Sequence, residues 1–214
     1  KKKMAQEKEE KKKREEEKKG RAWYEKFRWF ISSEGFIVIA GRDSTTNDII
    51  VKKHMEKDDI VFHTNIAGSP FTIIKTEGKI PGEETKREAA IETASFSRAW
   101  KMGISEAEVF QVNPEQVSSS VKSGEYMGKG AFMIYGKRNT MHAEVKLGIG
   151  LYDGRIMCAP LSAVRKHCKK LLIITQGSEK KTSAAKLIKK EIGGEIDDIV
   201  SALPPGEVKV SKQE

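Results

Sequence analysis

Cysteine and long apolar runs are both scarce in this sequence. Its 214 residues include two cysteines, Cys158 and Cys168, whose spacing fits neither a CxxC pair nor a disulfide framework and favours a reducing compartment. No apolar run approaches the roughly 18 residues that a membrane span needs. The N-terminal stretch is charged throughout, unlike a signal peptide. We therefore expect a cytoplasmic protein without a membrane partner.

Catalytic and cofactor motifs are missing as well. A P-loop needs four residues between its glycines and a helix after them, whereas Gly124 and Gly128 enclose three residues and an apolar run follows Gly130. No GxSxG or HExxH motif occurs. The histidines are scattered rather than grouped as metal ligands are: His54, His63, His142 and His167. The sequence thus predicts no enzyme, no cofactor, no metal site and no small-molecule ligand.

Positive charge, by contrast, is abundant. The formal net charge is +9 and the sequence pI is about 9.4, which favours a polyanion such as RNA, DNA or an acidic membrane surface. Residues 1–19 hold ten Lys or Arg and six Glu, with opposite charges at helical spacing but no apolar seam. We interpret residues 1–20 as a charged helix, either a solvated tail or the end of a longer coiled coil. Since the chain starts at Lys1 inside this run, we expect a piece of a longer protein.

Apolar periodicity and turn residues predict an α+β fold. We expect a mixed, mainly antiparallel sheet packed by helices in a domain over residues 21–140, and a smaller α/β C-terminal subdomain over 141–214, with the boundary near Thr140. The predicted elements are a hairpin over 23–40, a helix over 45–55 capped by Thr45, strands over 60–64 and 71–75, a long helix from Pro81 to about Met102, a strand over 108–112, a hairpin around Tyr152-Asp153-Gly154, a helix over 161–168, a fully covered strand over 171–175, helices over 182–191 and 196–203, and an edge strand over 208–210.

One stretch, Ser123 to Asn139, concentrates the features that suit an anionic partner. An apolar run, 131–135, is long enough for one buried strand, and a glycine turn carrying cations lies on each side: Gly128-Lys129-Gly130 before it and residues 136–139 after it. Glycine allows positive φ and leaves no Cβ in the way of a ligand. Such turns could hold a phosphate backbone, or they could be ordinary turns with solvated lysines.

Further cations fall at predicted strand ends, turns and helix ends. Together with the glycine turns they form the predicted phosphate-binding set: Arg42, Lys52, Lys53, Lys101, Lys129, Lys137 and Arg138. If they converge, each one adds a phosphate contact. Trp23, Tyr24 and Trp29 could stack on bases or pack in the core. The turn over residues 177–182 is a weaker candidate for a phosphate at a helix N-terminus.

Several blocks resemble the NFACT-R domain of the NFACT family, the ribosome quality-control proteins that include eukaryotic NEMF and bacterial RqcH. The blocks are WYEKFRWFISSEGFIVIAGRDSTTNDIIVKKHM, DIVFHTNIAGSPFTIIK, VNPEQVSSS and GEYMGKGAFMIYGKRN, within residues 22–139. The positions matching the family are Gly41-Arg42-Asp43, Asn47, His63, Gly68, Gly124-Glu125-Tyr126 and Gly136-Lys137. His63, which the apolar strand alone marks as a core or wall residue, joins the predicted RNA-binding set through this resemblance.

The resemblance implies an RNA-binding module that works on stalled large ribosomal subunits. Family members are expected to bind a large subunit blocked by peptidyl-tRNA and to recruit tRNA for untemplated C-terminal tailing. The implied partners are tRNA or rRNA of the large subunit, with ribosomal proteins as further partners. The tail after Thr140 fits an archaeal-type extension. Because the family's N-terminal lobe is not in this sequence, tailing is not assigned to this chain.

The residues leave one other function open. The head helix and the strand edges could instead hold protein partners, so that the chain acts as an interaction scaffold with non-specific nucleic-acid or DNA binding. An enzyme that processes nucleic acid is not supported, because no catalytic constellation accompanies the basic residues.

Overall fold

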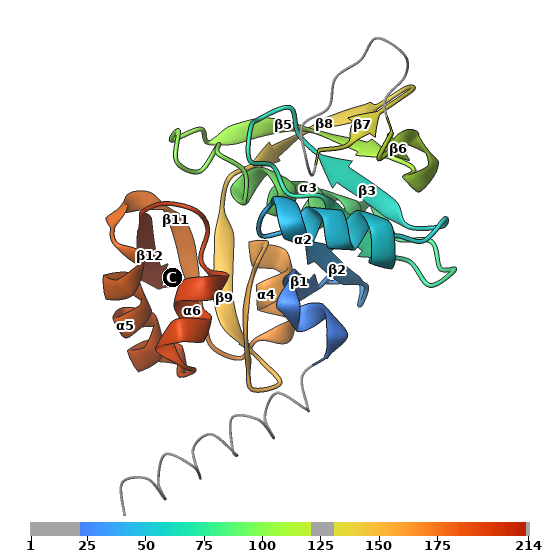
Figure 1. The fold of residues 1–214 in the computed structure, drawn as a ribbon. Helices are drawn as coiled ribbons and strands as arrows, with labels where there is room; N and C mark the ends of the chain where they lie inside the picture. Colours follow the sequence, from blue (N-terminus) through green and yellow to red (C-terminus); the bar gives the residue numbers. More distant parts are fainter. Residues whose placement is uncertain (1–21, 121–130, 213–214) are drawn as a thin grey trace, which may run out of the picture.

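The computed structural model describes residues 22–120 and 131–212, whose strands form two larger antiparallel sheets and one two-stranded sheet (Figure 1). The first has six strands in the order β1-β2-β4-β3-β5-β8, and the second has four in the order β10-β9-β11-β12. Helices pack on both sheets, so the predicted α+β class is confirmed. The charged helix expected over residues 1–20 lies outside the described residues. None of the described helices is long and apolar enough to cross a membrane.

The first sheet is built from short strands with local partners. Its elements are η1 (Trp23–Lys26), β1 (Arg28–Ile31), β2 (Ile37–Ala40), α2 (Ser44–Ile49) continuing as η2 (Ile50–His54), β3 (Ile60–His63), β4 (Thr72–Lys75), α3 (Glu83–Ser95), β5 (Glu106–Val112) and β8 (Asn139–Glu144). The predicted hairpin is present as β1 and β2, which pair from Arg28↔Ala40 to Ile31↔Ile37. The predicted helix after it is also present, although Asp43, rather than Thr45, caps it by accepting the Thr46 N–H at 2.8 Å.

Helix α3 covers the first sheet and is shorter than predicted. Its buried small residues, among them Ala89, Ala90 and Ala94, allow close packing against the strands. The prediction that it runs to Met102 is wrong, because the helix ends at Ser95 and turns follow. There the Ser97 hydroxyl donates to the Ala94 carbonyl at 2.7 Å and accepts the Ala99 N–H at 3.1 Å. Such side-chain hydrogen bonds compete with helical ones.

The apolar run 131–135 does not form the predicted buried strand. Between β5 and β8 lie η3 (Pro114–Gln116), β6 (Val117–Ser118) and β7 (Met133–Ile134), and β6 pairs only with β7. Both residues of β7 are half-buried. Because β6 and β7 pair only with each other, outside the two larger sheets, the run 131–135 has a strand partner on one edge only. Few apolar residues pack over it.

The second sheet follows the first after β8. Its elements are β9 (Leu147–Tyr152), β10 (Arg155–Ala159), α4 (Leu161–His167), β11 (Leu171–Glu179), α5 (Lys181–Ile192), α6 (Ile196–Ala202) and β12 (Val208–Lys212). Tyr152 pairs with Arg155 across the predicted two-residue turn. The chain passes from one sheet to the other between Glu144 and Leu147, a few residues beyond Thr140.

Two expectations about β11 are wrong. The strand is not fully covered, since buried Leu172 and Ile174 alternate with half-buried neighbours. It also runs on to Glu179, so Gly177 lies inside the sheet against the backbone of Val208 and not in a phosphate-binding turn.

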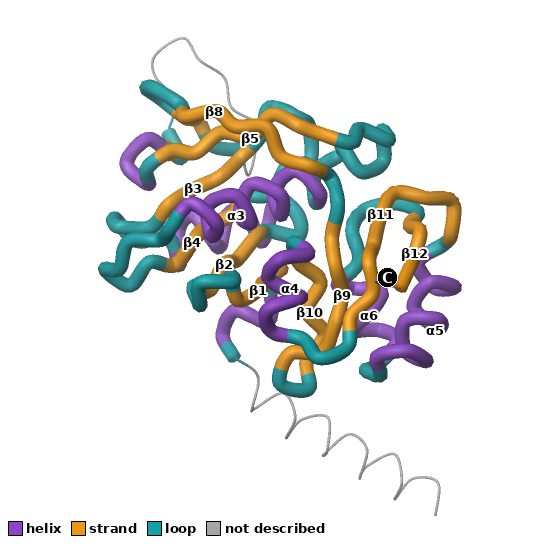
Figure 2. Tube along the Cα trace, turned by 180° about the vertical axis from the view of Figure 1, so that it is seen from behind, coloured by secondary structure: helices purple, strands orange, loops and turns teal. Residues whose placement is uncertain are grey.

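The two sheets share one hydrophobic core (Figure 2). Buried residues of both sheets form a single cluster, in which β1 lies against β10 and α3 reaches β9. The side-chain amide of Gln176 on β11 donates to the carbonyls of Ala99, Trp100 and Ile104, at 2.9–3.1 Å. The positions of surface groups on the two sheets are therefore fixed relative to each other.

Candidate nucleic-acid interface

The turn that follows β7 is held in place by one side chain. The amide of Gln116 donates to the carbonyls of Tyr135 and Lys137, both at 2.8 Å. Gly136 between them has φ +81°, and a Cβ there would meet the Gln116 amide at 3.2 Å. A glycine is needed at this position. We call residues 135–139 the Arg138 turn; it holds Lys137 and Arg138 on the surface.

The Arg138 side chain is fixed against the end of the first sheet. Its guanidinium lies 4.5 Å from the centre of the Phe110 ring and donates to Asn65 Oδ1 at 3.2 Å and to the Ile134 carbonyl at 3.3 Å. Phe110 is buried, whereas Arg138 is exposed. The outer face of a planar cation is thus presented to solvent, where it can stack on a base or contact a phosphate.

His63 supports this arrangement without adding charge. Its ring lies between Phe71 and Phe110, with centroids 4.3 and 5.9 Å away, and Phe132 packs edge-on against Phe71. Burial, with a smaller contribution from the Arg138 charge, lowers the pKa of His63 to about 4. The imidazole is therefore neutral at pH 7, so His63 belongs to the wall behind Arg138 and is not a cation for phosphate.

A second exposed group lies at the N-terminal side of the first sheet. Trp23 is 47% exposed and stacks on His54 at 4.7 Å, with an angle of 15° between the rings. Lys53 is exposed on the same helix as His54, while Lys52 is paired with Asp48 at 2.7 Å. Burial and the nearby Lys26, Lys75 and Lys53 charges lower the pKa of His54.

The other two aromatic candidates are packing residues. Trp29 is buried, and Tyr24 is half-buried with its ring 5.2 Å from that of Trp29. Of the three aromatic residues proposed to stack on bases, Trp23 is the one that offers a free face.

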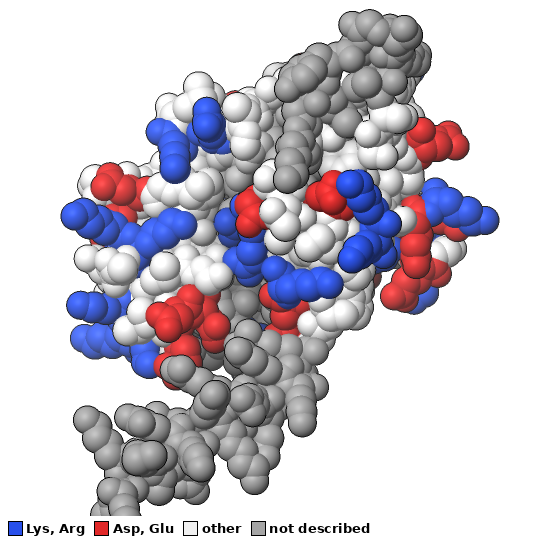
Figure 3. All heavy atoms as spheres, viewed as in Figure 1, with Lys and Arg blue, Asp and Glu red and all other residues white. Residues whose placement is uncertain are grey.

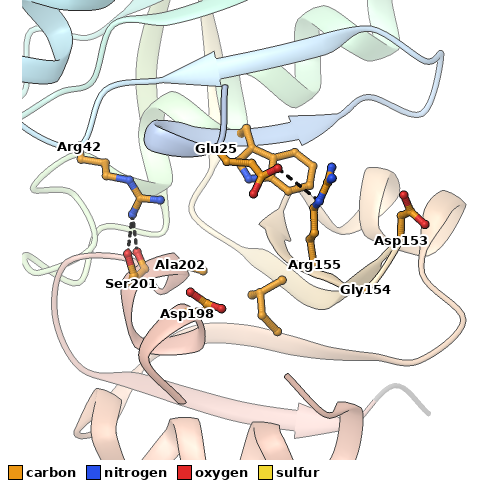
Figure 4. A pocket seen from close by; sticks show the side chains of 10 residues that line it. Glu25, Arg42, Asp153, Gly154, Arg155, Asp198, Ser201 and Ala202 are labelled. Carbon is orange, nitrogen blue, oxygen red and sulfur yellow. Dashed lines mark hydrogen bonds and ion pairs between the residues drawn. The ribbon is translucent and has the colours of Figure 1, made fainter. Parts of the chain in front are cut away.

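Arg42 forms its hydrogen bonds at the junction between the two sheets. Its Nη1 donates to the carbonyl and hydroxyl of Ser201, at 2.8 and 2.9 Å, and its Nη2 donates to the Phe27 carbonyl at 3.0 Å. Figure 4 shows this contact on one side of a pocket of about 440 Å³, with the Glu25–Arg155 ion pair (3.3 Å) on another. Arg42 thus has a structural role here.

The predicted cations do not form one patch. Lys101 is exposed beside Gly206, where the neighbouring Trp100 donates to the Glu207 carbonyl at 2.9 Å. Lys129 lies outside the described residues. On the face drawn in Figure 3, basic and acidic side chains are interspersed over the first sheet. Among the described residues, the structure therefore brings together His63 and Arg138, with Lys137 beside them, and leaves Arg42, Lys52, Lys53 and Lys101 away from this group.

Sequence reasoning missed the residues that build the Arg138 turn. Gln116, Asn65 and Phe110 carry no charge, and nothing in local periodicity links them to Arg138. The available signal was their position within or beside the blocks that resemble the family. Among residues 22–120 and 131–212, no group of three or more His, Cys, Asp or Glu side chains could hold a metal ion.

Residues 26–136 match the model of the NFACT protein RNA binding domain, which covers just over half of the chain. The chain belongs to the NFACT family. The resemblance of the sequence blocks to NFACT-R is thereby confirmed, and the matched segment includes Phe110 and ends at Gly136.

Curated relatives of this NFACT chain are ribosome quality-control proteins. The archaeal Rqc2 homolog aRqcH of Methanocaldococcus jannaschii is 43% identical over 91% of the chain and 30% of its own length. The NEMF homolog of Drosophila melanogaster is 40% identical over 60% of the chain and 13% of its own length. The archaeal relative matches most of the C-terminal subdomain too, as expected for an archaeal-type member. The chain spans less than a third of the length of either protein.

One solved structure also resembles the NFACT chain. It is the C-terminal part of the fibronectin/fibrinogen-binding protein from Streptococcus suis, with a TM-score of 0.47 and 20% identity over 55% of this chain and 45% of that one.

Proposed function

We propose that the chain is the RNA-binding module of a cytoplasmic ribosome quality-control factor, with no catalytic activity of its own. In this proposal the whole factor binds stalled large ribosomal subunits that carry peptidyl-tRNA, and it recruits tRNA for C-terminal tailing. The match of residues 26–136 to an RNA-binding domain model carries the proposal. The similarity to an archaeal Rqc2 homolog and to a NEMF homolog supports its ribosomal context.

The Arg138 turn is the proposed contact with tRNA or rRNA. Lys137 and Arg138 are exposed and adjacent, and Gln116 holds the backbone that carries them. A fixed guanidinium loses less conformational freedom on binding than a mobile one. It can pair with a phosphate through two N–H groups or stack on a base. Neutral His63 and the Phe110 ring keep the Arg138 guanidinium in its solvent-facing orientation.

Binding of tRNA at increasing salt tests this contact. We expect Lys137→Glu/Arg138→Glu to bind tRNA about tenfold more weakly than the unchanged protein, with the salt slope of log K reduced by about two. The matched control is Lys79→Glu/Arg87→Glu, which makes the same charge change at exposed positions in the β4–α3 loop and on α3. Equal affinity and slope in the Arg138-turn variant and the unchanged protein would refute the proposal.

A further inference from the structure

The excess positive charge lies mostly outside the segment that matches the RNA-binding domain. Residues 22–144 contain 16 Lys or Arg against 17 Asp or Glu, whereas residues 145–214 contain 13 against 8. The first sheet and its helices are therefore close to neutral, and the C-terminal subdomain is basic. Figure 3 shows Lys and Arg side chains gathered over α5, at the left-hand edge of the molecule. A polyanion would be attracted more strongly to this subdomain than to the first sheet.

Three cations from two segments of the chain line one hollow in this subdomain. The hollow has a volume of about 390 Å³, and we call it the basic cleft. Among its lining residues are Lys169 and Lys170 from the α4–β11 turn, Glu191 and Ile192 from the end of α5, and Lys212 from the end of β12. These elements are well separated in the sequence. Figure 2 shows the α4–β11 loop and α5 near the same, lower end of the second sheet.

The backbone that carries these lysines is fixed. Gly150 on β9 lies so close to the turn that a Cβ would meet the Cys168 side chain at 2.6 Å and the Lys170 carbonyl at 2.8 Å. A residue larger than glycine would push the turn away. On the other wall, Lys212 Nζ lies 2.9 Å from Glu191 Oε2 and ties β12 to α5. The cleft is thus present before any ligand binds.

The local electrostatic field in the cleft is positive. Lys212, through its hydrogen bond and its charge, and then the charges of Lys190 and Lys170, lower the pKa of the Glu191 carboxyl. This carboxylate is the one acidic group among the cleft residues named above, against three lysines. With Lys212 paired to Glu191, Lys169 and Lys170 leave the cleft with an excess of positive charge, which attracts a phosphate.

Ordinary helix capping explains only part of this cluster. Lys189 and Lys190 lie in the last turn of α5, where cations oppose the helix dipole. Lys169 and Lys170 follow the C-terminal end of α4, and Lys212 pairs with Glu191. These separate local roles do not by themselves require that the three lysines line one cleft.

The chemistry of the cleft favours a phosphodiester backbone over a membrane. A membrane-binding surface needs exposed apolar side chains beside its cations. In residues 145–212, Leu187 is the one large hydrophobic side chain that is exposed, at 41%. We propose that the basic cleft, built by Lys169, Lys170 and Lys212, binds the phosphate backbone of RNA as a contact separate from the Arg138 turn. This inference concerns residues outside 26–136 and shares with the proposed function only the class of ligand.

The test uses Lys169→Glu/Lys170→Glu in the whole chain. We expect it to bind labelled polyuridylate about tenfold more weakly, with a salt slope smaller by about two. The control Lys79→Glu/Arg87→Glu should bind like the unchanged protein. Lys169→Gln/Lys170→Gln, which removes charge without reversing it, should give a smaller loss in the same direction. Unfolding midpoints are measured for all variants. If the glutamate variant does not fold, RNA binding by the glutamine variant tests the inference instead.

Comparison with Lys137→Glu/Arg138→Glu separates this inference from the proposed function. If the Arg138-turn variant weakens RNA binding and the cleft variants do not, the inference about the cleft is overturned and the proposed function stands. If only the cleft variants weaken binding, the cleft inference holds and the Arg138 turn loses its proposed role. Anionic lipid vesicles test the competing ligand: vesicle binding that depends on Lys169 and Lys170, with RNA binding unaffected, would also overturn the inference.

Discussion

Glu92 is an acidic residue inside the protein core. It lies on α3, is fully buried, and neither carboxylate oxygen has a hydrogen-bond partner within the described part of the chain. Burial raises its pKa to about 8, although Arg28 and Arg42 act in the opposite direction. The folded protein therefore keeps a proton on Glu92 at pH 7, where the unfolded chain has lost it.

Stability should consequently fall as the pH rises. Because the folded state holds one more proton than the unfolded state between the ordinary pKa of 4.5 and about 8, the free energy of unfolding should decrease by about 1.4 kcal/mol per pH unit in this window. Below pH 4.5 both states are protonated and this effect is absent. Glu92→Gln should remove the slope and leave the variant more stable than the unchanged protein at pH 8.

Urea unfolding at several pH values measures this effect. The control is Glu115→Gln at an exposed position, which should keep the full pH dependence. Parallel curves for Glu92→Gln and the unchanged protein would show that Glu92 is ionised in the folded state.

The effect of His63 on the pH dependence of stability should have the opposite sign to that of Glu92. Its pKa is lowered from 6.5 to about 4, so the unfolded chain takes up a proton that the folded protein does not. The contribution of His63 to the free energy of unfolding is fully present above pH 6.5 and is lost as the pH falls towards 4. In an NMR titration we expect the His63 ring signals to stay constant from pH 7 to about 5. A His63 midpoint near 6.5 would contradict the neutral wall assigned to it.

At the scale of elements, three cations cap the end of α6. The carbonyls of Ser201, Ala202 and Leu203 accept hydrogen bonds from Arg42, Arg28 and Lys181, at 2.8, 3.4 and 3.2 Å. The last carbonyls of a helix have no partner within it and carry its negative dipole end. Since Arg28 and Arg42 come from the first sheet, the cap also joins the two sheets.

Removing one of these cations should destabilise the fold without changing RNA binding. Arg42→Met keeps much of the side-chain volume but loses three hydrogen bonds, and we expect the free energy of unfolding to fall by about 1.5–3 kcal/mol. Arg87→Met is the control, because an exposed ion pair contributes about 0–1 kcal/mol. The salt slope of tRNA binding should be the same in Arg42→Met and the unchanged protein. A slope reduced by about one would instead make Arg42 a phosphate contact.

Helices and strands could be predicted from the sequence more accurately than the side-chain contacts between them. The β9–β10 hairpin follows from Tyr152-Asp153-Gly154, because turn chemistry is local. The Arg42 contact with Ser201 spans 159 positions, and no local pattern encodes it. The same limit applies to the Arg138 turn, where basic residues were predicted correctly as surface groups but Gln116, Asn65 and Phe110 were not. The short β7 shows that an apolar run forms a buried strand only where a sheet edge is available to it.

At the scale of the whole molecule, the single core predicts how the protein unfolds. Phe27 and Phe30 of the first sheet and Ile149 and Ile174 of the second belong to one buried cluster. The α6 cap and the Gln176 amide add polar contacts across the same junction. Loss of either sheet would expose apolar surface on the other, at roughly 25 cal/mol per Å². Independent unfolding of the two sheets is therefore unfavourable.

We accordingly expect one cooperative unfolding transition that includes both sheets. Hydrogen exchange of the amides of β4, inside the first sheet, reports on that sheet. Hydrogen exchange of the β11 amides reports on the second. The two probes should give the same midpoint and the same free energy of unfolding in urea. Gln176→Ala should lower both midpoints equally, because the residue on β11 holds the carbonyls of 99–104 beside the first sheet. Separate transitions, or a Gln176→Ala effect confined to β11, would mean that the Arg138 turn and the basic cleft are carried by independently folding units.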